Sequence, residues 1–540
     1  MTSIETATSD SALSTNLQAA LGLPAPVDIA IDPNDQMFTF IASTRGSDAL
    51  GRSDYLTSGA QLLKILEQLV VWKFGSFKNV SALLDFASGF GRLTRFLIEK
   101  LPPDRVWVSD IQADAVAFQE AQFGVHGYVS TADPDALICD QQFDCIFVAS
   151  LFSHLPPTSF TRWLKKLSSF LKPGGLLAFT VHDATRLPAG ETMPDSGIWF
   201  SAASEIGSID AKDYGDAIVT EDYVRQAIVA ATGRPTYQRI PLGLLFHQDI
   251  YLVVNDTSAD FSDFHFAYLP HGVIDYALWL KPGELYVRGW AADMAGADAP
   301  LGIRVYIDGQ LRKECVPSHP RPDVSFHYGR KNFLMSGWDC SFPVPDSDPS
   351  HFITVKARST AGIEALLYVG PIASLLPAGK AESCLWVAPD ELYVRGWAVD
   401  MLGMASPVQV QVSVEGQLVE TCSPFIYRPE LRKHFDDDRF LRSGWECLLN
   451  LPNGDPTQML EVKSLLGSGI ESILYKGPIS FLEAQGSTAL SQERMDLITL
   501  DADLQNRLEY IHHLEAEIGR KNAAIADLES RLRRRPWQRR

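Results

Sequence analysis

Apolar and polar residues alternate in blocks along the first half of the chain. Short continuous apolar runs indicate strands that are buried on both faces, and the stretches between them carry apolar residues at helical spacing. Strands and helices that alternate in this way predict a doubly wound parallel sheet. We expect strands at 82–86, 106–110, 127–130, 143–149 and 175–181, helices at 57–74, 91–100, 113–122, 158–171 and 221–231, and an antiparallel hairpin of 237–245 with 248–254.

The second half of the chain is a duplication. The segment Glu284–Ala291 (ELYVRGWA) recurs at 391–398, and the same offset continues without a gap to the Gly-Pro pairs at 370 and 477. Short alternating segments separated by turn residues predict one immunoglobulin-like β-sandwich in each copy, at 268–374 and 375–482. The paired tryptophans lie beside glycines in apolar segments, so we interpret them as core residues rather than sugar-stacking platforms: Trp290, Trp338, Trp397 and Trp445.

A heptad repeat begins at Leu497 and predicts an α-helical coiled coil over 490–533. Such a segment favours self-association or docking to a partner protein. The basic tail at 534–540 has three open interpretations: contact with an anionic membrane surface, binding to an acidic partner, or a solvated end.

Composition narrows the class of protein. A net charge of −19 over 540 residues argues against a nucleic-acid binder, and no apolar run is long enough to span a membrane. The Ser/Thr/Ala-rich start predicts a disordered leader over 1–34 rather than a signal peptide. Seven sparse cysteines without CxxC spacing indicate a reducing cytoplasm and no metal cluster.

The stretch from Val80 to Leu97 (VSALLDFASGFGRLTRFL) combines an apolar run, a turn of small residues and a helical segment. Glycines allow a sharp turn and the close approach of a ligand, and the helix start offers free N–H groups. Asp110 ends the next strand, where a carboxylate can accept both ribose hydroxyls of a nucleotide. The sequence therefore predicts a nucleotide-like cofactor over this turn.

The turn Asp85–Gly91 resembles motif I of class I S-adenosylmethionine-dependent methyltransferases, with Ala87 at a position where glycine is common. The segments Phe143–Pro156 and Leu171–Leu177 resemble the fourth- and fifth-strand motifs of that family at the right spacing. The resemblance covers about 50–255 and implies a Rossmann-like seven-stranded methyltransferase domain, which we place at 35–258. It implies S-adenosylmethionine as cofactor, with contacts from Asp85, Ala87, Ser88, Gly89, Gly91, Asp110, Ile111, Asp133, Ser150 and Leu151.

Within that superfamily, the segments SHLP, KPGGLLAFTVHD, DYG and FHQDIYLV resemble bacterial methyltransferases encoded with polysaccharide-biosynthesis glycosyltransferases. This resemblance implies O-methylation of a sugar hydroxyl, on a glycan or glycolipid acceptor. A hydroxyl acceptor requires a positioned base, because its pKa lies far above 7. By position the candidates are His182, His154, Asp183 and His247, with His182 ranked first and His154 second.

Other functions remain open at this stage. The β-sandwiches and the coiled coil could serve a non-catalytic adaptor, and the methyl acceptor could be a protein or a small molecule. An intact small-residue turn and Asp110 favour the enzyme over the adaptor. We expect a cytoplasmic protein, peripheral at the inner membrane if the basic tail binds lipid, with a glycosyltransferase or a second copy as partner of the coiled coil.

Overall fold

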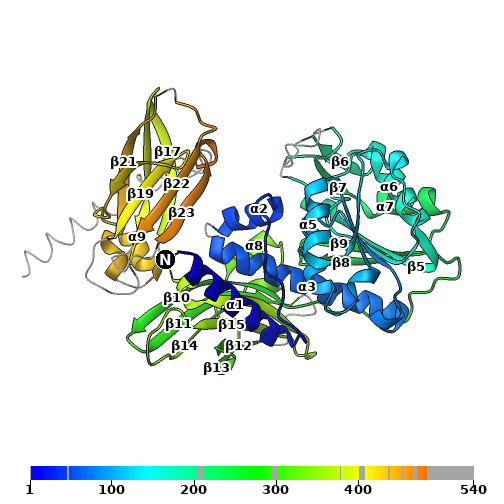
Figure 1. Ribbon diagram of the computed structural model, residues 1–540, viewed down its shortest axis with the longest axis horizontal. Coiled ribbons are helices and arrows are strands. Elements are labelled where there is room, and N and C mark those ends of the chain that lie inside the picture. Colours follow the sequence, from blue (N-terminus) through cyan, green and yellow to red (C-terminus); the bar gives the residue numbers. More distant parts are fainter. Residues whose placement is uncertain are drawn as a thin grey trace, which may run out of the picture. The chain divides into compact units, whose positions relative to one another are not determined.

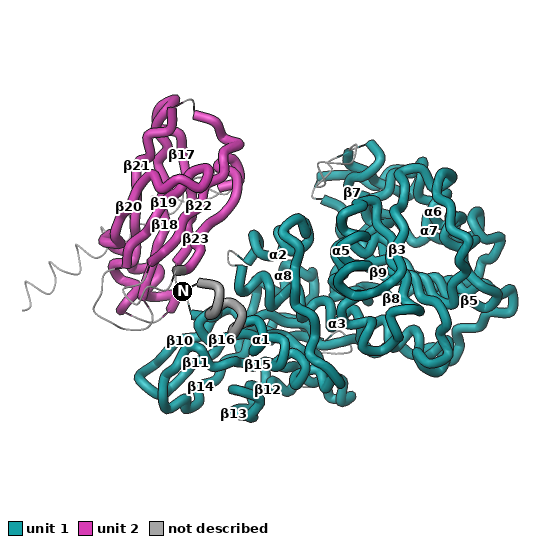
Figure 2. Tube along the Cα trace, viewed as in Figure 1, with its two compact units in different colours: residues 1–378, 401–403 teal, residues 379–400, 404–540 magenta. Residues whose placement is uncertain are grey.

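The computed structural model describes residues 2–45, 48–188, 190–202, 212–293, 301–376, 379–400, 408–435, 438–452, 454–465 and 471–482. The predicted coiled coil and the basic tail lie outside the described residues. The chain divides into two compact units, one of residues 1–378 with 401–403 and one of residues 379–400 with 404–540 (Figure 2). No described helix is both long and apolar enough to cross a membrane.

A mixed sheet forms the centre of the methyltransferase-like region (Figure 1). Seven strands lie in the order β3-β2-β1-β4-β5-β9-β8, and only β9 runs antiparallel to its neighbours on both sides. Their bounds are β1 Leu83–Phe86, β2 Val106–Asp110, β3 His126–Val129, β4 Phe143–Val148, β5 Leu171–Asp183, β8 Gln238–Leu244 and β9 Gln248–Val254. The predicted parallel sheet with a terminal antiparallel hairpin is confirmed.

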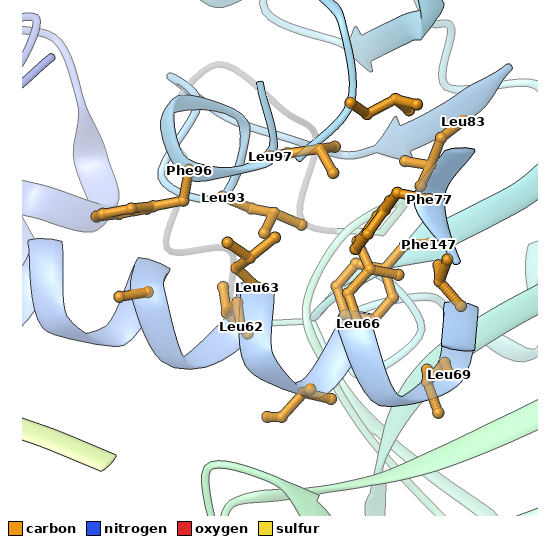
Figure 3. Close-up of a cluster of buried hydrophobic side chains, with 14 of the residues drawn as sticks. Leu62, Leu63, Leu66, Leu69, Phe77, Leu83, Leu93, Phe96, Leu97 and Phe147 are labelled. Atoms are coloured by element: carbon orange, nitrogen blue, oxygen red, sulfur yellow. The ribbon is translucent and has the colours of Figure 1, made fainter. Parts of the chain in front are cut away.

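Helices cover both faces of this sheet, because successive residues of each strand point to opposite sides. Leu83 on β1 faces the cluster that contains α3, whereas its neighbour Leu84 faces the cluster that contains α6 and α7. The helices are α2 Gln36–Arg45, α3 Asp48–Phe74, α4 Thr94–Leu97, α5 Ala113–Phe123, α6 Pro157–Ser169 and α7 Glu221–Thr232. Short 3-10 turns lie at Phe77–Asn79, Pro103–Arg105, Pro134–Ala136 and Ala184–Arg186. Figure 3 shows the leucines of α3 packed beneath Leu83, Leu93 and Phe147.

Three local features differ from the sequence prediction. The helix expected at 91–100 is the single turn α4, because the residues before it form turns. The segment Pro173–Gly175 does not precede β5 but forms an irregularity inside it, with Gly174 at φ +74°. An additional antiparallel pair, β6 Ile198–Ser201 and β7 Asp216–Val219, joins the carboxyl end of β5 and brings the sheet to nine strands.

The prediction of a disordered leader is wrong. Residues Thr2–Leu21 form helix α1, and Leu13 and Leu17 are buried in the same cluster as α3. The segment that follows is also ordered, since the guanidinium of Arg95 donates to the carbonyls of Asp28 and Ala30. The Ser/Thr/Ala-rich segment 1–34 contains only a few apolar residues, so its sequence does not predict a helix that packs in the core.

The first repeat shares its core with the methyltransferase-like region. Helix α3 packs on strand β16 (Glu364–Pro371), and Leu366 and Val369 belong to the cluster that holds Leu66. The amide of Gln61 donates to the Leu366 carbonyl at 2.8 Å, and the Val369 N–H donates to the Ser53 hydroxyl at 3.2 Å. The predicted boundary between 258 and 268 is therefore not a boundary between separate cores.

Each repeat contains a three-stranded and a four-stranded sheet. In the first repeat both sheets contribute to one buried cluster, which includes Val287 from one and Val305 from the other. The strands are β10 His271–Lys281, β11 Glu284–Ala292, β12 Gly302–Ile307, β13 Gln310–Cys315, β14 Gly337–Pro343 and β15 Phe352–Arg358, with helix α8 Pro322–His327 and 3-10 turns Lys331–Phe333 and Ile372–Leu375. The sheets are β10-β11-β14 and β13-β12-β15-β16.

The second repeat reproduces this arrangement at the sequence offset of the duplication. Its elements are β17 Gly379–Ala388, β18 Glu391–Ala398, β19 Gln409–Val414, β20 Gln417–Cys422, α9 Pro429–Phe435, a 3-10 turn Asp438–Arg442, β21 Gly444–Asn450, β22 Met459–Leu465 and β23 Glu471–Pro478. The interpretation of the paired tryptophans as core residues is confirmed: Trp338 and Trp445 are fully buried, and Trp290 and Trp397 are at most 9 % exposed.

Candidate active site

The turn after β1 contains three residues with positive φ, namely Ala87 at 60°, Gly89 at 53° and Gly91 at 80°. Left-handed backbone is costly for a residue with a Cβ, so Ala87 marks local strain of the kind that concentrates at binding sites. A Cβ added to Gly89 would meet nothing within 4 Å, whereas one on Gly91 would lie 2.5 Å from Phe123. Gly91 is thus required by packing, while Gly89 leaves open space above the turn.

Asp110, at the end of β2, accepts hydrogen bonds that fix the turn after β1. One carboxylate oxygen accepts the Gly89 N–H at 2.9 Å and the other accepts the Gln112 N–H at 3.0 Å. The side chain is buried, and this burial raises its pKa while the backbone hydrogen bonds oppose the shift. Each oxygen has a further lone pair, so the carboxylate can still accept the hydroxyls of a ribose. The next residue, Ile111, is half-buried beside it.

Asp85 lies beneath the turn and is buried, and this burial raises its pKa to about 7. The Thr94 hydroxyl donates to it at 3.4 Å, and the Arg92 guanidinium opposes the rise in pKa. Gln119 ties α5 to the turn by donating to the Ser88 hydroxyl at 2.8 Å and to the Gly89 carbonyl at 2.7 Å. A cationic ligand above the turn would therefore meet the carboxylate of Asp110, with the carboxyl of Asp85 buried beneath the turn.

Ser150 follows β4 with φ at 64°, a second strained position at the edge of the sheet. Its N–H donates to the Thr180 hydroxyl of β5 at 2.8 Å, and its own hydroxyl contacts Gln248 of β9. Leu151, the next residue, is half-buried. These contacts join the ends of three neighbouring strands around one buried amide.

Three histidines meet beside this amide. The rings of His182 and His247 are 5.1 Å apart, and those of His154 and His182 are 6.3 Å apart. The Gln248 Nε2 lies 3.3 Å from His182 Nε2, and His154 Nδ1 lies 2.8 Å from the Gly215 carbonyl. His154 also stacks on Tyr214 at 4.7 Å. The structure thus brings together three candidate bases from the connection after β4, the end of β5 and the turn before β9.

His182 and His247 are neutral near pH 7. Burial, reinforced by the neighbouring histidines and Arg186, lowers the pKa of His182 to about 3. His247 keeps an exposed surface, but the partial loss of its hydration, together with Arg186, lowers its pKa to about 4. Because a carbonyl accepts, His154 Nδ1 carries a proton, which leaves its Nε2 unprotonated in the neutral ring. A neutral imidazole has a lone pair that can accept a proton, although a pKa lowered this far makes His182 and His247 weak bases.

Two predicted residues have other partners in the structure. Asp183 forms an ion pair with Arg239 at 2.7 Å, and Arg239 also pairs with Asp249 and Glu221. Asp133 is exposed and pairs with Arg162. Asp183 therefore orders the β5–β9 edge and is not available as a base, which corrects its candidacy.

Sequence reasoning missed Gln248, Arg186 and Tyr214. Gln248 directly follows His247 in the segment FHQDIYLV, so its position in β9 was predictable, but its burial between two other strands was not. Tyr214 belongs to the DYG segment, which the family resemblance grouped with the histidine-bearing segments, but its stacking on His154 was not predicted. Arg186 lies in a connection without periodicity, and nothing in the sequence pattern relates it to the histidines.

Comparisons with known proteins agree with this geometry. Residues 84–177 match the family model of a methyltransferase domain. No curated protein sequence matches the chain. The prediction of a methyltransferase domain with S-adenosylmethionine as its cofactor agrees with the family match.

Similar solved structures include an S-adenosylmethionine-dependent methyltransferase from Clostridium acetobutylicum, at 17% identity, covering 37% of this chain and 91% of that one, with a TM-score of 0.26. Human N-acetylserotonin methyltransferase in complex with SAM is 17% identical. The match covers 42% of this chain and 61% of the human protein, with a TM-score of 0.26. The chain thus spans about three fifths of the human protein. The N-methyltransferase NodS from Bradyrhizobium japonicum, in complex with S-adenosyl-L-homocysteine, is 15% identical. The match covers 46% of this chain and 99% of NodS, with a TM-score of 0.25. The sheet order, the turn and the family match together identify residues 84–177 as a methyltransferase domain.

Proposed function

We propose that the chain is an S-adenosylmethionine-dependent methyltransferase that methylates a hydroxyl group, on a sugar of a surface polysaccharide or glycolipid intermediate. The observation that carries the proposal is the Asp110 carboxylate bound to the Gly89 N–H at the carboxyl end of β2, at the same edge of the sheet as the neutral His182, which lies near the carboxyl end of β5. The family match over 84–177 supports the same reaction class.

The residues present fit this cofactor. Asp110 can accept ribose hydroxyls, the space over Gly89 is open, and the buried Asp85 can add a second negative charge beneath the turn. When bound, S-adenosylmethionine supplies an electrophilic methyl group on a sulfonium. A pKa near 7 at Asp85 lets a bound cation ionise this carboxyl without a large cost at neutral pH.

One of the histidines would act as the general base that accepts the proton of the acceptor hydroxyl. A sugar hydroxyl must lose its proton during the transfer, and His154 Nε2 can take it directly. The Gln248 amide donates to His182 Nε2 and so favours the tautomer with the proton on Nδ1. His182 Nε2 can therefore take the proton only in place of this hydrogen bond. The Thr180 and Ser150 hydroxyls hold the Gln248 carbonyl oxygen and thereby set the orientation of this amide.

The sugar acceptor rests on the resemblance to polysaccharide-associated methyltransferases. We propose in the same way that the coiled coil at 490–533 mediates self-association or docking to a glycosyltransferase, and that the basic tail at 534–540 contacts the inner membrane from the cytoplasm. Enrichment of arginine in a terminal segment supports electrostatic attraction to anionic lipid.

Titration calorimetry of the full chain with S-adenosylmethionine tests the cofactor. We expect binding in the wild type and a loss of at least about tenfold in Asp110→Ala, because a charge-assisted hydrogen bond is lost. Asp104→Ala is the matched control, since Asp104 is an exposed aspartate in the connection before β2. Absence of binding, or equal affinity in Asp110→Ala, would overturn the proposal.

A transfer assay with labelled cofactor and sugar acceptors then tests the base. His182→Gln and His154→Gln should each bind S-adenosylmethionine as the wild type does, and at least one should lose about 100-fold or more in transfer rate. Full transfer activity in the double variant would exclude histidine as the base.

A further inference from the structure

We propose that the acceptor site extends onto the first repeat and binds an oxyanion of the acceptor, a phosphate or carboxylate group, between Arg186 and Tyr328. Arg186 belongs to the methyltransferase domain and Tyr328 to the first repeat, and both lie within one compact unit. This inference rests on the proposed function and specifies the chemical class of its acceptor.

The β8–β9 turn joins the first repeat to the histidines. Phe246 in this turn is 3 % exposed and stacks on Phe333 of the first repeat at 5.8 Å. The same aromatic cluster includes Trp290 and Tyr328. The next residue, His247, contacts His182 and has an exposed surface. One turn therefore carries an anchor in the first repeat and a histidine in the active site on adjacent residues.

Arg186 lies at the end of the 3-10 turn that follows β5, close enough to His182, His247 and Tyr328 to interact with them electrostatically. Among the described residues, no carboxylate pairs with its guanidinium. The side chain is half-buried, so part of its hydration is lost without a compensating anion. An oxyanion in this position would satisfy the guanidinium, whose fork geometry matches phosphate and carboxylate.

Histidines lie near Arg186. His182 and His247 interact with it electrostatically, and their rings lie 5.1 Å apart. A neutral imidazole can donate one N–H to an oxyanion. Of the carboxylates in this region, Asp216 lies 3.9 Å from His154 Nδ1. The nearby carboxylate of Asp183 is engaged by Arg239. Because His182 and His247 are neutral near pH 7, the guanidinium of Arg186 supplies the positive charge that would attract an anionic ligand here, in a chain whose net charge is −19.

The duplication provides an internal comparison. In the alignment of the two copies, His327 corresponds to His434, but Tyr328 corresponds to Phe435. Phe435 stacks closely on Phe440 at 4.1 Å, whereas Tyr328 lies 5.7 Å from Phe333, which also stacks on Phe246. The hydroxyl is thus present only in the copy that borders the active site, which favours a role in binding over a role in packing.

Calorimetry of the full chain saturated with S-adenosyl-L-homocysteine tests the site, with inorganic phosphate, glucose 6-phosphate, glucuronate and glucose as probes. We expect the phosphorylated or the carboxylated sugar to bind at least about tenfold more tightly than glucose. Tighter binding of glucose 6-phosphate would identify a phosphate site, and tighter binding of glucuronate a carboxylate site; either result supports the proposal.

Variants of Arg186 and Tyr328 test whether these side chains bind the oxyanion. Arg186→Gln should weaken the anionic probe at least about tenfold, Arg186→Lys should weaken it less, and Tyr328→Phe should weaken it about threefold to tenfold. Arg312→Gln, in the exposed strand β13, is the control for net charge. S-adenosyl-L-homocysteine affinity should stay within about twofold in every variant, so failure of this site and failure of the cofactor site are distinguishable. Equal binding of glucose, or unchanged binding in Arg186→Gln, would overturn the inference.

Discussion

His351 shows how single titratable groups stabilise the first repeat. Its Nδ1 lies 2.5 Å from Asp308 and its Nε2 lies 2.7 Å from Asp346, and these hydrogen bonds raise the pKa of the imidazole above its usual value. A raised pKa means that the folded state holds the proton more tightly than the unfolded chain. The stabilisation is fully present below the unfolded pKa of about 6.5 and is lost as pH rises through the folded pKa.

We predict that His351→Gln lowers the free energy of unfolding by up to about 1 kcal/mol at pH 5.5 and by progressively less above pH 7, because the pair is partly exposed. Glutamine is the residue at the corresponding position of the second repeat, Gln458, so the repeat fold accommodates it. Urea unfolding at pH 5.5, 7 and 9 measures the effect. An equal loss at pH 5.5 and pH 9 would contradict the assignment to the charged pair.

Residue identities at the site were largely predictable, but their partners were not. The motif resemblance selected Gly89, Asp110 and His182, and the structure joins Gly89 to Asp110 by a hydrogen bond and puts His182 near the end of β5. It could not show that Asp183 is neutralised by Arg239, since the two lie 56 residues apart and meet only through the pairing of β5, β9 and β8. Ionisation states depend in the same way on burial, which is a tertiary property.

At the scale of elements, the two glycines of the turn after β1 have different roles: Gly91 is needed for packing, and Gly89 leaves room for the cofactor. Gly91 has φ +80° and no room for a Cβ, because Phe123 and Gln119 approach it within 3 Å. Gly89 has φ +53° and open space around it. The short helix α4 has only a small dipole, so binding relies on the turn and on Asp110 more than the predicted ten-residue helix implied.

We predict that Gly91→Ala destabilises the fold by about 2–4 kcal/mol, from overpacking and left-handed strain together. Gly89→Ala should cost only about 1–2 kcal/mol, yet it should weaken S-adenosylmethionine at least about tenfold by filling the space above the turn. Thermal unfolding and calorimetry on both variants separate the two effects. Comparable stability losses, or full cofactor affinity in Gly89→Ala, would be inconsistent with this division.

Strands were predicted better than the irregular connections between them. Long apolar runs such as β4 and β9 are specified by continuous burial, and their predicted bounds agree with the structure within a residue. The pair β6–β7 escaped prediction because its strands are four residues each and lie in a long polar connection. Helix α1 escaped because its burial depends partly on strands β15 and β16, which come from the distant first repeat.

At the scale of the whole molecule, the first repeat is part of the enzyme's structural core. Helix α3 presents one side to the methyltransferase sheet and contacts β16 with another, and α1 packs on the same strand. Removal of the first repeat would expose these apolar surfaces of α1 and α3 to solvent, at about 25 cal/mol per Å². The second repeat forms its own compact unit.

We predict that a truncated chain of residues 1–376 binds S-adenosylmethionine with the affinity of the full chain, whereas residues 1–260 melt at a clearly lower temperature or aggregate. Scanning calorimetry and calorimetric titration of both truncations provide the measurement. A 1–260 fragment that melts and binds like 1–376 would show that the shared core contributes little.

The hydrogen bond from Gln61 to Leu366 spans 305 residues and has a consequence for synthesis. Long-range contacts of this kind slow folding, because the entropy of closing the chain is lost before the contact forms. At about 5–20 residues per second, the ribosome needs about 15–60 s between making α3 and making β16. During that interval the incomplete chain carries a helix with an uncovered apolar side, so the nascent protein should depend on chaperones until β16 emerges.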